Sequence, residues 1–310
     1  MIFSGFADEA ADSIEHQILA TKALGWRNIE LRKAGGQFAH DVSEAEFDRI
    51  AGCLSDAGVG VHCLGSRIAN NGRIDQADEP SLDQARRAIP RMRRLGTKLV
   101  RIMSWSVDVS QPPAQRLGAQ RIARLRELAA MFADAGMTMV HENCGNYGGQ
   151  GWRWSLELLE AVPGLKLVFD PGNCIKDHDV DAAPLPDGSL PNQSAWEFYR
   201  RVRDHIVHFH VKDARHASDG SFRWCFPGEG EAHVEQIIRD LLLRGYAGAF
   251  SIEPHLGIGL HHGIPAAEAR LRTYIEYGHR TEALIAAIRG RLVADGCAID
   301  GYAPAAERDR

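Results

Sequence analysis

The sequence lacks three features that would place it in other classes of protein. No run of apolar residues approaches the 18 needed to cross a bilayer, so we expect no membrane span. The formal net charge is −5, from 36 Lys and Arg against 41 Asp and Glu. Because nucleic-acid binders usually carry a basic surface, we expect no nucleic-acid partner. The first residues reach Asp8 and Glu9 without a basic leader, so we expect a cytoplasmic protein.

Paired cysteines and a phosphate-binding turn are also missing. The six cysteines are Cys53, Cys63, Cys144, Cys174, Cys225 and Cys297, and no two of them form a CxxC pair. In a chain of 310 residues this scatter indicates free thiols in a reducing compartment. A dinucleotide-binding fold would carry a glycine-rich turn after its first strand, and the residues after Phe6 do not form one.

The sequence does contain eight short apolar segments that alternate with helical patterns. The apolar segments are residues 2–6, 28–32, 59–64, 98–104, 137–142, 166–170, 206–212 and 249–253. The helical patterns include residues 12–24, 43–57, 81–95, 114–135, 234–243 and 266–289. Strands that alternate with helices indicate βαβ units and a parallel sheet.

The connections between these segments favour a closed barrel. Six helices are followed by a glycine that can take the left-handed conformation of a helix end: Gly25, Gly58, Gly96, Gly136, Gly164 and Gly245. Connections from helix to strand are therefore short, whereas those from strand to helix are long and polar. This asymmetry predicts an α/β fold, a single (β/α)8 TIM barrel over residues 1–295, with its active site at the C-terminal ends of the strands. An open doubly wound sheet is the alternative. Residues 296–310 are predicted to form a loosely ordered tail.

Four predicted strands carry side chains that bind metals at their carboxyl ends. Residues 207–212 alternate apolar with polar side chains, as expected of a strand. If the polar side faces the barrel axis, Glu142, Asp170, His210 and Glu253 converge. Three carboxylates and one imidazole suit one divalent ion, Mn²⁺ first, with Mg²⁺, Co²⁺ and Zn²⁺ as alternatives. Taken singly, each residue has another use, in a salt bridge or a loop cap.

Further polar residues face the same way and are predicted to bind substrate. Lys212 has three roles open to it: it anchors a phosphate, polarises a carbonyl, or neutralises a nearby carboxylate. Asn173 binds a hydroxyl or caps a loop. Arg32, His62 and His255 are further candidates, and polar residues on early strands, such as Arg32 and His62, also form structural networks.

Several segments together resemble the xylose-isomerase-like barrel superfamily, the sugar phosphate isomerase/epimerase group. They are residues 7–10, 29–32, 141–143, 169–173, 208–213, 227–230 and 251–255. The resemblance implies that Glu142, Asp170, His210 and Glu253 bind one divalent metal. It also implies that Glu142 and Glu253 are catalytic and exchange protons on opposite faces of a keto sugar through an enediolate. The expected function is a metal-dependent sugar isomerase or epimerase.

Two departures from that family keep a second reaction open. Ketose 3-epimerases of the group carry a histidine where this chain has Asn173 and a glutamate where it has Gly148. The alternative is a lyase or hydratase that acts on 3-keto-sugars or 3-keto-glycosides by the same enolisation. An apurinic-site endonuclease would need a multinuclear site and a basic surface, and a metal-free sugar-binding module would need no ion. We expect a small carbohydrate as partner, and a homo-oligomer is left open.

Overall fold

Eight parallel strands form one sheet that curls into a barrel. The computed structural model describes residues 1–70, 72–76, 79–257 and 265–299. The strands are β1 (Ile2–Gly5), β2 (Asn28–Leu31), β5 (Gly60–Gly65), β6 (Leu99–Ile102), β7 (Thr138–Glu142), β8 (Lys166–Phe169), β9 (Ile206–Val211) and β12 (Ala249–Ile252). They pair in the order β1-β12-β9-β8-β7-β6-β5-β2, and a bridge between Phe6 and Glu30 brings the two ends together. The nearly closed barrel confirms the predicted TIM-barrel fold.

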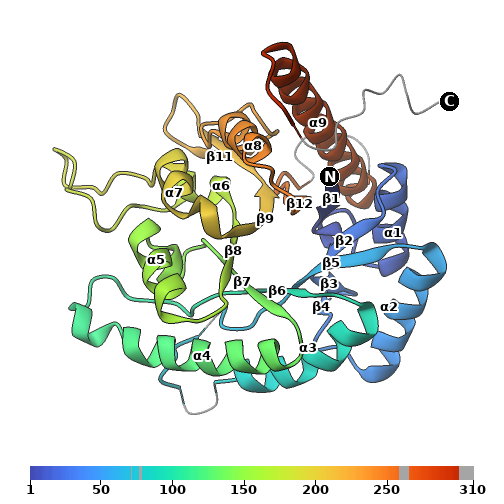
Figure 1. Ribbon diagram of the computed structural model, residues 1–310, viewed down its shortest axis with the longest axis horizontal. Coiled ribbons are helices and arrows are strands. Elements are labelled where there is room, and N and C mark those ends of the chain that lie inside the picture. Colours follow the sequence, from blue (N-terminus) through green and yellow to red (C-terminus); the bar gives the residue numbers. More distant parts are fainter. Residues whose placement is uncertain (71, 77–78, 258–264, 300–310) are drawn as a thin grey trace.

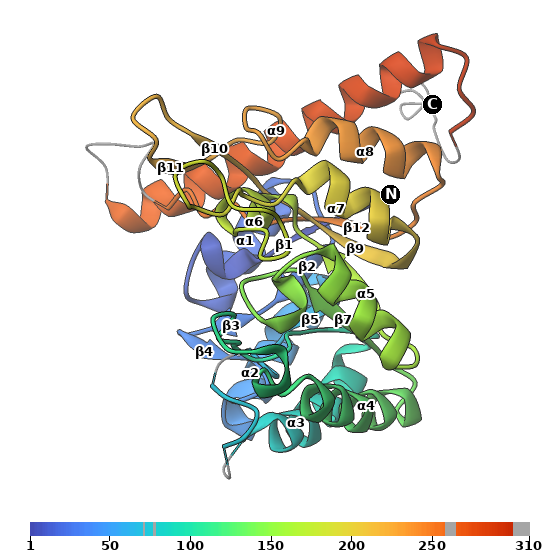
Figure 2. The ribbon, with the colours of Figure 1, turned by 90° about the vertical axis from the view of Figure 1, so that its left-hand side faces the viewer.

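Helices cover the outside of this barrel (Figure 1). They are α1 (Ile14–Ala23), α2 (Glu44–Ala57), α3 (Ser81–Leu95), α4 (Gly118–Asp134), α5 (Trp152–Ala161), α6 (Pro171–Lys176), α7 (Ala195–Val202), α8 (Val234–Leu243) and α9 (Ala266–Ala294). Serine side chains cap the N-termini of several helices. Ser43 accepts a hydrogen bond from the amide of Glu46 in α2, and Ser194 accepts one from the amide of Glu197 in α7. Figure 2 shows α9 lying along α8.

Two predicted helices differ from the observed ones. The pattern over residues 114–135 predicted one helix, but Leu117 has a left-handed φ of +58° and separates a short turn, Pro113–Gln115, from α4. The last helix continues five residues beyond position 289, because Ile288 and Leu292 still pack in the core. The six glycines that follow helices all have positive φ, between 65° and 78°, as predicted.

The core divides into two parts, outside and inside the barrel. The larger part lies between the sheet and the helices. A smaller cluster of Cys63, Val140 and Val168 lies inside, because Val140 and Val168 precede Glu142 and Asp170 by two residues and share their face. No described helix is long and apolar enough to cross a membrane. The proposed domain limits remain a prediction, and residues 300–310 of the predicted tail lie outside the described residues.

Candidate metal and active site

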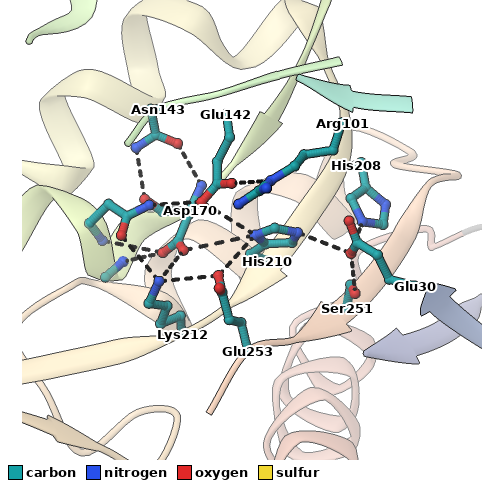
Figure 3. A network of polar contacts seen from close by, with 12 residues as sticks. Glu30, Arg101, Glu142, Asn143, Asp170, His208, His210, Lys212, Ser251 and Glu253 are labelled. Carbon is teal, nitrogen blue, oxygen red and sulfur yellow. Dashed lines mark hydrogen bonds and ion pairs between the residues drawn. The ribbon is translucent and has the colours of Figure 1, made fainter. Parts of the chain in front are cut away.

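The four residues predicted to bind a metal meet at the carboxyl end of the barrel (Figure 3). Glu142 is the last residue of β7, Asp170 follows β8, His210 lies in β9 and Glu253 follows β12. One potential ligand atom from each lies within 4.8 Å of the others, and all four residues are buried. Because these strands are neighbours in a parallel sheet, their ends reach the same height.

The two ring nitrogens of His210 face different carboxylates. Its Nε2 lies 3.0 Å from Oε2 of Glu30, whereas Nδ1 faces Oε2 of Glu253 at 3.3 Å, Oδ2 of Asp170 at 3.8 Å and Oε1 of Glu142 at 3.9 Å. Burial opposes a charge on the ring, but the carboxylates, Glu30 foremost, raise the pKa of His210 well above its usual value. Nδ1 is buried and has no hydrogen-bond partner among the described residues. An unpartnered nitrogen facing three carboxylate oxygens fits a hard divalent cation.

The two glutamates that were predicted to be catalytic are held in similar ways. Oε2 of Glu142 accepts a hydrogen bond from Nε of Arg101 at 2.5 Å, and its Oε1 one from Nδ2 of Asn173 at 3.0 Å. Oε1 of Glu253 lies 3.3 Å from Nη1 of Arg32, which leaves Oε2 facing the centre. Burial alone would raise the pKa of both glutamates. Arg101 lowers it for Glu142, and Lys212 brings that of Glu253 well below its usual value.

Lys212 lies among the carboxylates and not at a free surface. It is 2% exposed, and its ammonium group donates to Oδ2 of Asp170 at 2.9 Å, Oδ1 of Asn173 at 3.1 Å and Oε2 of Glu253 at 3.1 Å. These bonds use all three of its hydrogens. Of the roles left open for this lysine, the geometry therefore favours neutralisation of the carboxylates over the binding of a phosphate.

The positions that depart from the 3-epimerases are occupied in other ways. Asn173 joins Glu142 to Lys212 through its amide, so it belongs to the carboxylate network. Gly148 is buried, and a Cβ placed on it would lie 2.6 Å from Cε1 of His141 and 2.6 Å from Cδ1 of Leu158. A glutamate side chain at this position would need the surrounding loop to move.

Arg32 and His255 lie at the mouth of the barrel, whereas His62 lies within it. Arg32 donates to Asp8 and also approaches Glu9, so a positive charge already lies between Glu9 and Glu253. The ring of His62 stacks on His208 with 5.4 Å between centroids. Burial lowers the pKa of His62 to about 4, which keeps the ring neutral.

Sequence reasoning missed Glu9, which holds His255 at two points. Oε2 of Glu9 accepts a hydrogen bond from the amide of His255 at 2.7 Å, and Oε1 lies 2.8 Å from its Nδ1. With these two contacts His255 has a left-handed backbone conformation, with φ of +51°. Its Nε2 lies 3.4 Å from Oε1 of Glu253. Non-glycine residues in this conformation are enriched at functional sites. The acidic pair Asp8 and Glu9, in the turn that follows β1, was the available signal.

The segment that follows β9 has a structural role. The carboxylate of Asp213 accepts hydrogen bonds from the amides of Ala214, Gly228, Gly230 and Ala232. It thereby ties the loop at residues 226–232 to the hairpin of β10 (Asp213–His216) and β11 (Phe222–Cys225). That hairpin carries Trp224, whose ring lies 4.7 Å from Nζ of Lys212.

The fold is a TIM barrel, and its buried carboxylates and imidazole lie at the carboxyl ends of the strands. This is where TIM-barrel enzymes have their active sites. The chain belongs to the xylose isomerase-like TIM barrel family, whose model matches residues 18–274. It is 25% identical over 254 residues to fructoselysine 3-epimerase of Shigella flexneri, covering 77% of this chain and 84% of that protein.

Solved structures share the fold at lower sequence identity. One is a xylose isomerase-like TIM barrel protein from Mycobacterium smegmatis in complex with magnesium. It is 18% identical with a TM-score of 0.64, over 92% of this chain and 97% of that one. Another is L-ribulose 3-epimerase, 17% identical with a TM-score of 0.66, over 98% and 99% of the two chains.

Proposed function

We propose that this protein is a divalent-metal-dependent sugar isomerase or epimerase that removes a proton next to a carbonyl. The observation that carries the proposal is the convergence of Glu142, Asp170, His210 and Glu253 within 4.8 Å, with Nδ1 of His210 unpartnered. Similarity to a fructoselysine 3-epimerase supports a sugar as substrate, and a relative of the same fold binds magnesium. The same four residues would hold the ion, with Mn²⁺ expected first and Mg²⁺, Co²⁺ or Zn²⁺ as alternatives.

The ion would supply Lewis acidity for the negative charge that develops on the sugar oxygens. The proton transfers belong to Glu142 and Glu253, which approach the centre from β7 and β12, with β8 and β9 between them. One carboxylate takes a proton from the carbon next to the carbonyl, and the other returns a proton from the opposite side. Return to the same carbon inverts it. Return to the former carbonyl carbon isomerises the sugar, provided that the proton of the neighbouring hydroxyl passes to the former carbonyl oxygen.

A specific observation favours the second candidate, a lyase or hydratase for 3-keto-sugars or 3-keto-glycosides. Gly148 has no room for the glutamate that the 3-epimerases carry there, and the amide of Asn173 is committed to Glu142 and Lys212. Proton removal by the same glutamates would then be followed by loss of the group at the β-position.

An experiment in D₂O separates these reactions. The protein loaded with Mn²⁺ is incubated with free ketoses and, separately, with 3-keto-glucosides, and the products are followed by NMR. Deuterium at the carbon next to the carbonyl with inversion or isomerisation supports the first proposal. Release of an aglycone or hydration of a glycal supports the second. Nicking of abasic DNA would overturn both proposals. So would a protein that contains no metal when purified and takes up none when divalent ions are added.

A further inference from the structure

A second buried cluster lies inside the barrel, next to the four-residue site. Glu30 on β2 is 1% exposed, and its Oε2 is contacted by three groups from other strands (Figure 3). These are Nε2 of His208 at 2.7 Å, Nε2 of His210 at 3.0 Å and Oγ of Ser251 at 2.7 Å. Three contacts from two strands, β9 and β12, fix the orientation of this carboxylate.

The contact with Glu30 bears on which ring nitrogen of His210 carries the hydrogen. A carboxylate with three polar neighbours on one oxygen accepts hydrogen bonds from all of them, so Nε2 of His210 carries a hydrogen. Nδ1 is then the nitrogen left for the centre, where its neighbours are oxygens of Glu142, Asp170 and Glu253. In the other tautomer Nδ1 would carry the hydrogen, so an N–H would face the centre and no lone pair would be available there.

The spacing of Glu30, His208 and His210 would also suit a metal ion of their own. Their hydrogen bonds argue against it, because the Nε2–H groups of both histidines point at the same oxygen, so neither Nε2 has a lone pair to offer an ion there. Glu30 therefore acts on the site through His210.

We propose that Glu30 is a positioning residue, which holds His210 as the Nε2–H tautomer so that a divalent cation binds through Nδ1. The inference rests on the proposed function, because it assumes an ion among the four residues. Partners of metal-binding histidines typically contribute about 10–100-fold to metal affinity.

Two variants test this role. Glu30→Gln keeps the shape of the side chain but removes the charge, and Glu235→Gln makes the same change at an exposed residue in the first turn of α8. We expect Glu30→Gln to bind Mn²⁺ about 10–100-fold more weakly than wild type. Glu235→Gln should bind Mn²⁺ like wild type. Free Mn²⁺ is measured by electron paramagnetic resonance during titration of the metal-free proteins, whose folding is checked by circular dichroism.

A second measurement needs no variant of Glu30. Wild-type protein with ¹⁵N-labelled histidine is loaded with ¹¹³Cd²⁺, and coupling to the metal should appear on Nδ1 of His210, assigned by its loss in His210→Asn. Coupling on Nε2, or equal Mn²⁺ affinity of Glu30→Gln and wild type, would overturn the role of Glu30 and leave the proposed function intact. Failure of wild type to bind any divalent cation would overturn both.

Discussion

Replacing Lys212 by methionine should destabilise the metal-free protein and make it more responsive to metal. The ammonium group is buried and donates to Asp170, Asn173 and Glu253 at 2.9–3.1 Å. Methionine fills a similar volume but leaves the carboxylates without this cation. An added divalent ion would replace part of the lost positive charge, because it binds among the same oxygens.

The expected loss follows from the burial of the ion pairs. Removal of one partner from a buried pair costs about 3–5 kcal/mol, because the remaining charge stays out of water. One kcal/mol shifts Tm by about 2 °C in a large domain, so Tm should fall by roughly 6–10 °C. A free ion at a concentration 100 times its Kd adds about 2.7 kcal/mol to the free energy of unfolding of the wild type. The gain in Lys212→Met should be larger.

Calorimetry in EDTA and in excess Mn²⁺ checks both statements. Lys98→Met is the matched control, because Lys98 is exposed and precedes β6, at the end of the strand opposite to the site. Equal Tm of the two variants in EDTA would refute the assigned role of Lys212 in neutralising the carboxylates. An equal gain from Mn²⁺ in wild type and Lys212→Met would refute the idea that the lysine and the ion share oxygens.

Three further predictions concern the same site. Glu142→Gln and Glu253→Gln should each slow deuterium exchange of substrate by about 100-fold or more, since an amide cannot take the proton; exchange at the rate of the surface variant Glu235→Gln would contradict this. Metal affinity should weaken as pH falls, because the raised pKa of His210 lets a proton compete with the ion, and calorimetric titration at several pH values would show a flat profile if this is wrong. Gly148→Ala should lower the free energy of unfolding by about 1–3 kcal/mol through contact with His141 and Leu158. Gly290→Ala is the control: a Cβ at Gly290 in α9 would contact nothing, so this change should not lower the free energy of unfolding.

The barrel could be predicted from the sequence because its signals are local. A short apolar segment of five to seven residues marks each strand, and a glycine after six of the helices indicates where the next strand begins. The convergence of Glu142, Asp170, His210 and Glu253 follows from these signals, since equivalent positions on neighbouring parallel strands must meet. Helix ends were less certain, as the break at Leu117 shows.

The sequence by itself thus determined the fold and the meeting of Glu142, Asp170, His210 and Glu253 at the carboxyl end of the barrel. Only the tertiary structure decided how each side chain is held. Lys212 donates hydrogen bonds to Asp170 and Glu253, and Glu9 accepts one from the amide of His255, 246 residues away in the sequence. Glu30 likewise reaches His208 across 178 residues. Such contacts depend on side-chain rotamers and on packing between distant segments, for which the residue pattern along one strand carries no signal.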